Sequence, residues 1–426
     1  MTIKELSGIA KRESYVLAAL SGEKRKFALE NIAQEIKRNA EEIFAANDED
    51  LKRAEEAGLP MPVIKRLAFK EEKLAETLNE ISALINLPDP VGEVTLHREL
   101  AEGLILKRVT CPIGVIGAIF ESRPDALVQI ACLCIKSGNC VILKGGSEAA
   151  STNKALFKAI HTAALAAGLP ENCLILAESR EDVKSLLSCA GNVDLLLPRG
   201  SNEFVRYIME NTTIPVIGHS EGLCSIYIDE EYDPEIALRV VLDAKTQYVA
   251  VCNALDTLLI HKNAAPAIFP KIAEMFKEAK VELRAQEALL KYADCVKARE
   301  EDFDTEFLDY ILAVKQVESL EEAIEHINSH SSHHTDGIIT KNPENAEKFM
   351  NEVDSAGVYL NCSTRFADGN RYGFGAEVGI STGKIHARGP VGLSGLVTYK
   401  YKLYGNGDTV GQFAVGEKKY THKDLD

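Results

Sequence analysis

The chain has 426 residues, a hydrophobic content of 46 % and a formal net charge of −16. Its length allows two or three domains with full cores, and its acidity argues against non-specific nucleic-acid binding, which needs a broad cationic surface. No apolar run approaches the roughly 18 residues of a membrane-spanning helix, and the charged, amphipathic start is unlike a signal peptide. Ten cysteines without a CxxC pair indicate reduced thiols. We therefore expect a cytoplasmic protein that binds neither nucleic acid nor membranes.

The N-terminal part is predicted to be helical, and a hairpin follows it. Apolar side chains recur at helical spacing within residues 32–44 and 67–85, in two helical blocks that Gly58 separates. Residues 92–110 alternate in the manner of two strands joined at 101–103. Because an isolated two-stranded ribbon is marginal in water, we expect this hairpin to pack on another element or on another subunit.

Five short apolar segments then alternate with helical ones. We expect strands at residues 115–120, 140–143, 173–177, 194–197 and 214–217, and helices at residues 126–137, 149–167, 180–190 and 201–211. This alternation is typical of a parallel sheet covered on both faces, in which ligands bind at the carboxyl ends of the strands. Lys144 stands at one such end, where it could meet a ribose or a phosphate. The Arg199-Gly200-Ser201 turn opens a helix whose amides could hold a phosphate.

Two familiar nucleotide motifs are not matched. No GxGxxG fingerprint follows the first of these strands, so an ordinary Rossmann dinucleotide site is not indicated. The run from Gly379 to Lys384 is one residue short of a P-loop and does not follow a strand. We therefore reject a nucleoside-triphosphate hydrolase.

The region around Cys252 is the strongest candidate for chemistry. A strand at residues 224–229 leads into a polar junction at 230–234, where we place the main domain boundary. A helix at residues 234–247 follows, then an irregular stretch with Cys252, then a buried strand ending at His261. A thiol on a loop between rigid elements can be both exposed and accurately aimed, which favours a nucleophile. The alternative is one more small buried residue.

The rest of the chain offers two further signals. We expect helices at residues 267–279, 282–292 and 320–328, and strands at 307–317, 357–360 and 396–401. Three histidines (His330, His333 and His334) could suggest a metal site, but their spacing favours ordinary loop histidines. Between Arg365 and Lys402 six Lys and Arg residues (365, 371, 384, 388, 400 and 402) outnumber two acids, around a glycine-rich run. This inversion predicts anion recognition, and the alternative is a plain surface loop.

Five segments carry a resemblance to a known family. They are Ile119-Phe-Glu-Ser-Arg-Pro-Asp125, Leu143-Lys-Gly-Gly146, Cys252-Asn-Ala254, His334-Thr-Asp336 and Gly375-Ala-Glu-Val-Gly-Ile-Ser-Thr-Gly-Lys-Ile-His-Ala-Arg-Gly-Pro390. In order and over essentially the whole chain, the sequence resembles the γ-glutamyl phosphate reductases (glutamate-5-semialdehyde dehydrogenases) of the aldehyde dehydrogenase superfamily.

The resemblance implies an α/β, aldehyde dehydrogenase-like fold: two parallel-sheet domains plus a β-hairpin/C-terminal oligomerisation element. The expected parts are a cofactor-binding domain at residues 1–228, interrupted by the hairpin at 92–110, a catalytic domain at 229–390 and an oligomerisation segment at 391–426. Some positions depart from the family pattern. Val249-Ala250-Val251 stands where Pro and Ala often precede the cysteine, Leu255-Asp256 replaces Met-Glu, and the superfamily's Glu-Leu-Gly-Gly general-base element has no copy, although Glu221 lies in roughly that region.

The implied reaction is the NADPH-dependent reduction of L-glutamate 5-phosphate (γ-glutamyl phosphate) to L-glutamate 5-semialdehyde and phosphate, the second step of proline biosynthesis, through a cysteine thioester. Cys252 is the expected nucleophile, because a thiolate attacks a carbonyl readily. Its backbone N–H and a donor from Ser122 or Arg123 would hold the oxyanion. Because phosphate leaves readily and no water attacks, the missing glutamate base should matter little in this direction.

Further site residues and partners follow from the same resemblance. Cofactor contacts are expected from Lys144, Gly146, Arg199, Gly200, Ser201 and Glu306, and substrate contacts from Arg123, Asn253, Arg365 and Arg388, with no metal. A structural salt bridge is the alternative for each arginine, and a solvated charge is the alternative for Glu306. The implied partners are further copies of the chain and glutamate 5-kinase, whose acyl phosphate product is unstable in water. Preference for NADP or NAD stays open, as do three rival functions: an aldehyde-oxidising dehydrogenase, a silent scaffold and a histidine-based metallohydrolase.

Overall fold

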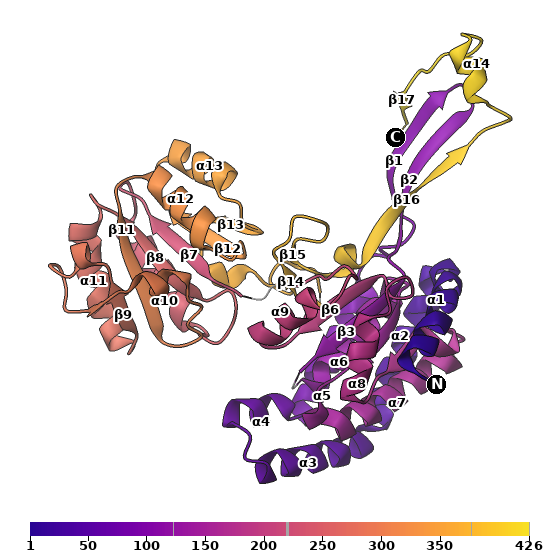
Figure 1. Cartoon of the computed structure of the whole chain (residues 1–426), viewed down its shortest axis with the longest axis horizontal. Helices are drawn as coiled ribbons and strands as arrows, with labels where there is room; N and C mark the ends of the chain where they lie inside the picture. The colour runs from indigo at the N-terminus through magenta and orange to yellow at the C-terminus, as the bar shows by residue number, and fades with distance from the viewer. Residues whose placement is uncertain (122, 219–220, 376, 426) are drawn as a thin grey trace. The chain divides into compact units, whose positions relative to one another are not determined.

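The computed structural model describes residues 1–121, 123–218, 221–375 and 377–425, and the chain forms two compact units (Figure 1). Unit 1 comprises Met1–Ile217, Phe374–Gly379 and Val391–Asp426, and unit 2 comprises Gly218–Gly373 and Ile380–Pro390. In the part of the chain that is described, no helix is long and apolar enough to cross a membrane.

The boundary between the units precedes β7 (Cys224–Ile228), whereas the sequence placed it after residue 228. The reason is strand pairing: β7 lies in parallel between β8 (Leu255–His261) and β12 (Thr335–Ile339) in the sheet of unit 2. The whole of β7 is buried. An apolar run of this kind fits either sheet, so periodicity alone cannot assign it to one of them.

Unit 1 is built on a four-stranded parallel sheet in the order β5-β4-β3-β6. Its strands are β3 (Val115–Phe120), β4 (Cys140–Lys144), β5 (Leu174–Leu176) and β6 (Leu195–Arg199). β3 and β4 are buried at every position, which explains their near-continuous apolar sequences. The strand predicted at residues 214–217 is wrong: this segment makes only a single bridge, from Val216 to Leu196.

Ten α-helices of the described chain belong to unit 1. They are α1 (Ile3–Ala19), α2 (Gly22–Arg38), α3 (Ala40–Glu56), α4 (Met61–Leu67), α5 (Glu71–Asn86), α6 (Pro124–Lys136), α7 (Ala150–Ala166), α8 (Arg180–Leu187) and α9 (Asn202–Glu210), with the short α14 (Val410–Ala414) near the C-terminus. A capping box on Thr2 begins α1, and Ser201 caps α9 by accepting a hydrogen bond from the Phe204 amide. The predicted N-terminal helical region is thereby confirmed.

An antiparallel sheet in the order β16-β2-β1-β17 projects from unit 1 as an arm (Figure 1). Its strands are β1 (Val94–Ala101), β2 (Leu104–Pro112), β16 (Val397–Tyr404) and β17 (Lys423–Asp424). β1 and β2 form the predicted hairpin, which turns at Gly103 with a φ of 76°. The C-terminal strand β16 pairs with β2 along its whole length, so the hairpin packs on a segment nearly 300 residues away in sequence.

Unit 2 contains a seven-stranded sheet in the order β10-β9-β11-β8-β7-β12-β13, with every pairing parallel. The remaining strands are β9 (Glu282–Ala285), β10 (Val296–Lys297), β11 (Ile311–Val317) and β13 (Gly357–Leu360), and a small ladder joins β14 (Ile380–Ser381) to β15 (Gly389–Pro390). One face packs on α10 (Pro234–Thr246) and α11 (Ala265–Glu278), and the other packs on α12 (Leu320–His330) and α13 (Pro343–Glu352). The predicted fold of two parallel-sheet domains is confirmed.

One predicted helix of unit 2 is wrong. Residues 282–292 begin with β9, whose side chains alternate between exposed and buried positions, and then form a short 3-10 turn at Glu287–Leu289. Leu283 and Ala285 enter the core that β9 shares with β11. The segment is rich in good helix formers, and its pairing in the sheet overrides that propensity.

Candidate functional site

Cys252 lies on the loop between α10 and β8, as the sequence predicts. The loop makes a turn in which the Ala254 amide donates to the Val251 carbonyl over 3.1 Å, and the Cys252 side chain is partly exposed. Gly222 packs directly against it: a Cβ on Gly222 would lie 2.3 Å from Cys252 Cβ and 2.4 Å from Cys252 Cα. Only glycine allows this close approach, so Gly222 helps to fix the position of the thiol.

Residues 363–371 hold the other side of the Cys252 loop. Asn253 donates from Nδ2 to the Ala367 carbonyl over 2.8 Å, and Thr364 Oγ1 donates to the Asn253 carbonyl over 2.8 Å. Arg365 donates from Nε to Gln247 Oε1 over 3.0 Å, and the Arg371 guanidinium donates to the Arg365 carbonyl. The nucleophile loop is thereby tied at both of its ends to a segment that carries two arginines.

The side chains of Arg365 and Cys252 lie within electrostatic reach of each other. The Arg365 side chain is 8 % exposed, and burial together with the neighbouring Arg371 lowers its pKa, while the negative charges of Cys252, Asp243 and Asp368 act in the opposite direction. A guanidinium can pair with a carboxylate or a phosphate through two parallel hydrogen bonds, so Arg365 suits an anionic ligand beside Cys252.

A layer of buried polar groups lies beneath the Cys252 loop. Cys224 Sγ donates to the Cys252 carbonyl over 3.3 Å and lies 3.9 Å from His334 Nδ1. Asp336 accepts hydrogen bonds from the Ser225 amide at 2.7 Å and from the hydroxyls of Ser331 and Ser355. Burial raises the pKa of Asp336 to about 6 and raises the pKa of Cys224 well above its ordinary value. Cys224 is thus a structural thiol rather than a second nucleophile.

The predicted cofactor residues of unit 1 come together at the carboxyl ends of β4 and β6. Lys144 is 7 % exposed and donates to the Gly145 carbonyl. Side chains press on the two glycines that follow: a Cβ would lie 2.2 Å from Asn153 Nδ2 at Gly145 and 2.0 Å from Glu148 Oε1 at Gly146. A lysine followed by two side-chain-free positions fits a ligand that carries ribose and phosphate groups.

The turn at Arg199-Gly200-Ser201 differs from the expectation. The Ser201 amide donates to Glu121 Oε2 over 3.0 Å, so this amide at the start of α9 holds a carboxylate of the chain itself. A Cβ on Gly200 would lie 2.5 Å from the same oxygen. The structure therefore brings the three residues beside Glu121, and a phosphate at the Ser201 amide would have to displace that side chain.

The remaining predicted residues are spread more widely. Ser122 lies outside the described residues, and Arg123 is exposed just before α6. Glu306 is partly buried in unit 2, where its charge acts on the buried Asp256. Arg388 donates from Nη2 to the carbonyl and to Oδ1 of Asp354, each over 3.1 Å. These contacts favour the structural alternative for Arg388.

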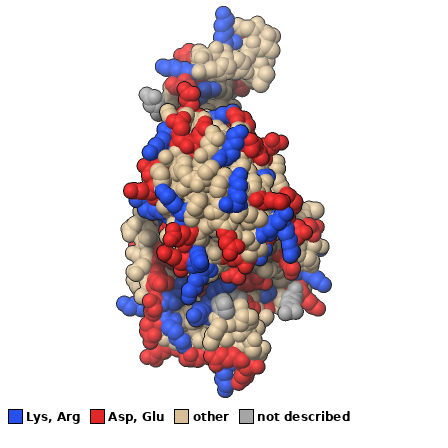
Figure 2. All heavy atoms as spheres, turned by 90° about the vertical axis from the view of Figure 1, so that its left-hand side faces the viewer, with Lys and Arg blue, Asp and Glu red and all other residues tan. Residues whose placement is uncertain are grey.

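The six cations between Arg365 and Lys402 do not form one group. Lys400 and Lys402 lie on β16 of the arm, and Lys384 pairs with Asp354 beside Arg388. The face in Figure 2 likewise mixes basic with acidic side chains. Of the predicted basic region, only Arg365 and Arg371 adjoin the nucleophile.

The three histidines at 330, 333 and 334 do not share a common site. His330 Nδ1 lies 2.7 Å from Asp304 Oδ1, while His334 is buried beside Cys224. Among the residues that the structure describes, no group of three His, Cys, Asp or Glu side chains could hold a metal ion.

Sequence reasoning did not connect Gly222 with Cys252, and it missed the buried pair Lys245 and Asp256. Gly222 carries no local signal, because its requirement comes from a contact with a loop thirty residues away. Asp256 carries a clear one: an acid inside the otherwise apolar run of β8 must have a partner when it is buried.

Comparison with known proteins agrees with this architecture. A sequence profile of the aldehyde dehydrogenase family matches residues 2–290 and 294–382. The γ-glutamyl phosphate reductase of Acetivibrio thermocellus is 55 % identical over 425 residues, which cover 100 % of this chain and 99 % of the relative. That of Pelotomaculum thermopropionicum is 53 % identical over 425 residues, with coverage of 100 % and 98 %.

Solved structures give the same answer. The crystal structure of γ-glutamyl phosphate reductase from Thermotoga maritima superposes with a TM-score of 0.94 at 38 % identity, covering 96 % of this chain and 100 % of that one. Glyceraldehyde-3-phosphate dehydrogenase GapN from Methanocaldococcus jannaschii, complexed with NADP, shares the fold at 18 % identity, with a TM-score of 0.66 and coverage of 95 % and 94 %. The chain belongs to the aldehyde dehydrogenase family and, within it, to the γ-glutamyl phosphate reductases.

Proposed function

We propose that this enzyme reduces γ-glutamyl phosphate to glutamate 5-semialdehyde and phosphate with NADPH, through a thioester on Cys252. The observation that carries the proposal is the Cys252 loop, which Gly222 and the Arg365 segment hold on two sides. A partly exposed thiol with a buried guanidinium in electrostatic reach is suited to attack an acyl group that bears a negatively charged leaving group.

The chemistry on Cys252 has two stages. The thiolate attacks the γ-carbonyl carbon, the bond from this carbon to the phosphate oxygen breaks, and inorganic phosphate leaves with the electron pair. NADPH, when bound, supplies the hydride that reduces the resulting thioester. The thiohemiacetal oxyanion on Cys252 then re-forms its carbonyl, the carbon–sulfur bond breaks, and the aldehyde leaves while the thiolate is restored. The Cys252 amide would stabilise the oxyanion in each stage, with a second donor from Ser122 or Arg123.

Substrate recognition falls mainly to Arg365. Its guanidinium can pair with the phosphate or the α-carboxylate, and Arg371 adds positive charge beside it. Asn253 Oδ1 is buried and has no hydrogen-bond partner among the described residues, so it could accept a bond from the substrate's ammonium group. Arg123 remains a candidate for the substrate, and Arg388 most simply holds Asp354.

The cofactor would be held by Lys144 and Gly146 at the end of β4, by Arg199, Gly200 and Ser201 at the end of β6, and by Glu306. Lys144 and Arg199 supply cations for the adenosine phosphates, which supports NADP, while Glu306 supplies a carboxylate for a ribose hydroxyl.

We also propose that the enzyme acts in the cytoplasm as a homo-oligomer, coupled to glutamate 5-kinase. All ten cysteines are free, which suits a reducing compartment. The edge strand β16 exposes Tyr399, Tyr401 and Leu403 at 53 %, 58 % and 57 %, and an exposed apolar edge of this kind is suited to pairing with another copy.

The test is the reverse reaction, in which glutamate 5-semialdehyde reduces NADP⁺, measured with and without phosphate in the wild type and in Cys252→Ala. We expect phosphate-dependent activity in the wild type and a loss of at least roughly 10⁴-fold in the variant, with an unchanged circular dichroism spectrum. Phosphate-independent activity would indicate an aldehyde-oxidising dehydrogenase. Activity that survives in the variant would remove Cys252 from the mechanism, and two folded but inactive proteins would indicate a silent scaffold.

A further inference from the structure

A buried ion pair closes the base of the Cys252 loop. Lys245 in the last turn of α10 and Asp256 in β8 are 0 % and 1 % exposed, and Lys245 Nζ lies 3.4 Å from Asp256 Oδ1. The two residues stand on either side of Cys252 in the sequence. Their contact therefore joins the helix that leads into the nucleophile loop to the strand that leaves it.

The stability of the fold does not explain this pair. Burial lowers the pKa of Lys245 and raises the pKa of Asp256 to about 7, so desolvation shifts both groups toward their neutral forms despite their mutual attraction. Replacing such a pair by apolar residues of similar size is often neutral or even stabilising. The pair is better explained by what its geometry holds in place.

A third segment is held by the pair. The Phe307 amide donates to Asp256 Oδ1 over 3.3 Å, which is the same oxygen that faces Lys245. The Phe307 ring lies between two cations, with Lys245 Nζ at 5.9 Å and Arg284 Cζ at 5.3 Å from its centroid. The next residue, Leu308, has a φ of 52°, a left-handed conformation that a leucine keeps only when its surroundings impose it.

Glu306 immediately precedes this held phenylalanine. Its own charge acts on Asp256, so the two carboxylates lie within electrostatic reach of each other. We propose that Lys245 and Asp256 are positioning residues that fix the Glu306–Leu308 segment, and with it the Glu306 carboxylate that binds the cofactor ribose, while they close the Cys252 loop. This inference rests on the proposed role of Glu306. In this view Lys245 and Asp256 together align the Cys252 loop with the segment that binds the cofactor.

The test compares NADPH binding, followed by fluorescence titration, with the KM for glutamate 5-semialdehyde. We expect Asp256→Asn and Lys245→Met each to weaken NADPH binding roughly tenfold, because a displaced carboxylate loses its hydrogen bond, and to leave the KM for the aldehyde within about twofold. Asp256→Glu should retain most of the binding, since it keeps a carboxylate within reach of Lys245 and the Phe307 amide. Lys262→Met removes a lysine from an exposed pair at the far end of β8 and should change neither quantity.

Glu306→Gln distinguishes the inference from the role on which it rests. If Glu306→Gln weakens NADPH binding and adding Asp256→Asn weakens it no further, the two residues act through one contact, as proposed. If the two effects multiply, or if Asp256→Asn lowers Tm without changing NADPH binding, the positioning role is wrong. If Glu306→Gln binds NADPH normally, the role of Glu306 fails first and the inference fails with it. Should Asp256→Asn not fold, Lys245→Met/Asp256→Leu removes both charges and takes its place.

Discussion

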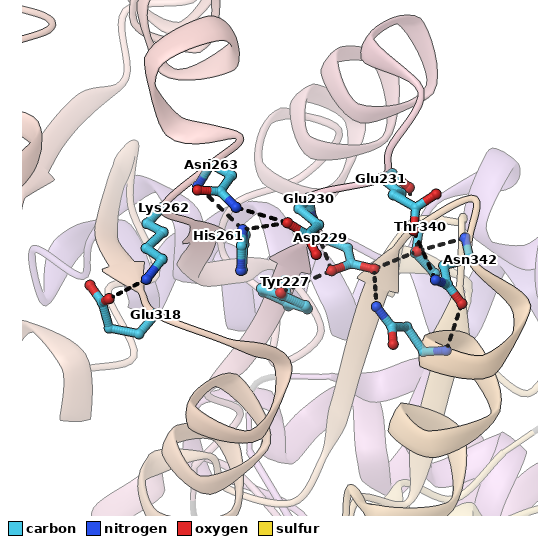
Figure 3. A network of polar contacts seen from close by, with 11 residues as sticks. Tyr227, Asp229, Glu230, Glu231, His261, Lys262, Asn263, Glu318, Thr340 and Asn342 are labelled. Atoms are coloured by element: carbon cyan, nitrogen blue, oxygen red, sulfur yellow. Dashed lines mark hydrogen bonds and ion pairs between the residues drawn. The ribbon is translucent and has the colours of Figure 1, made fainter.

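The two ends of the parallel sheet in unit 2 are built in opposite ways. At the carboxyl end, Asp229 lies in the centre of a closed polar network (Figure 3). It accepts from the Tyr227 hydroxyl at 3.1 Å, the Glu230 amide at 2.9 Å, the Thr340 hydroxyl at 2.7 Å and Asn345 Nδ2 at 2.8 Å. At the amino end, Asn253 Oδ1, Thr257 Oγ1 and His333 Nδ1 are buried without a hydrogen-bond partner among the described residues.

This difference indicates which end of the sheet in unit 2 is suited to bind a ligand. Buried polar atoms are nearly always paired, so unpaired ones at one end mark a place where ligand atoms or water complete the bonding. Open parallel sheets usually bind ligands at their carboxyl ends. In unit 2 the side chains of the loops at this end bond to neighbouring residues of the chain: His261 accepts from the Asn263 amide, and Lys262 pairs with Glu318 (Figure 3). Cys252 instead precedes β8, at the end that is less completely bonded.

Gly222→Ala should have the largest effect on kcat, because the added methyl group would collide with Cys252 at the amino end of the sheet. The added Cβ would lie 2.3 Å from Cys252 Cβ and from the Cys252 carbonyl oxygen, so the backbone of the nucleophile loop must move. A displacement of about 1 Å at a reacting group can cost roughly 100-fold in rate, and we expect kcat to fall by that order. Steady-state kinetics, with the rate of Cys252 alkylation by iodoacetamide, measures the change.

Gly337→Ala is the matched control for that substitution. Gly337 lies within β12 of the same sheet, and its added Cβ would meet nothing closer than the Tyr359 carbonyl oxygen at 3.5 Å, an ordinary contact. We expect kcat and the alkylation rate to stay within about twofold of the wild type. Equal losses in the two alanine variants would show that the close approach at Cys252 has no special importance.

Asp229→Asn should separate the two ends, with an effect on stability and little on catalysis. Asparagine brings an NH₂ group to an oxygen that now accepts two donors, so at least one buried hydrogen bond is lost, at a cost of about 2–3 kcal/mol in the free energy of unfolding. Urea unfolding measures this loss, and kcat/KM of the folded variant should stay within about twofold. Glu318→Gln, in the exposed pair with Lys262, should cost no more than about 0.5 kcal/mol. A large fall in kcat/KM for Asp229→Asn would contradict the view that the carboxyl end serves stability and the amino end serves catalysis.

The sequence predicted the fold and the position of the Cys252 loop better than it predicted the bonding around them. The alternation of apolar segments is a local property, so the parallel sheets and the Cys252 loop could be recognised from it. The contact of Gly222 with Cys252 and the pairing of the Ser201 amide with Glu121 depend on residues far apart in the chain. For the same reason β9 looked helical, because its pairing with β10 and β11 makes it a strand.

Asp336 gives the most selective test of the amino end, because its effect depends on pH. It is fully buried at the start of β12, and burial raises its pKa from 3.8 to about 6. Between these two values the folded protein binds more protons at Asp336 than the unfolded chain does, so its contribution to the free energy of unfolding falls as pH rises from about 4 to about 6. The slope should be on the order of 1 kcal/mol per pH unit. Urea unfolding of the wild type and of Asp336→Asn from about pH 4 upward isolates the contribution, since the difference between the two proteins should change with pH and become constant about one pH unit above the folded-state pKa. Two parallel curves would mean that Asp336 is ionised in the folded state throughout, held so by its three hydrogen-bond donors.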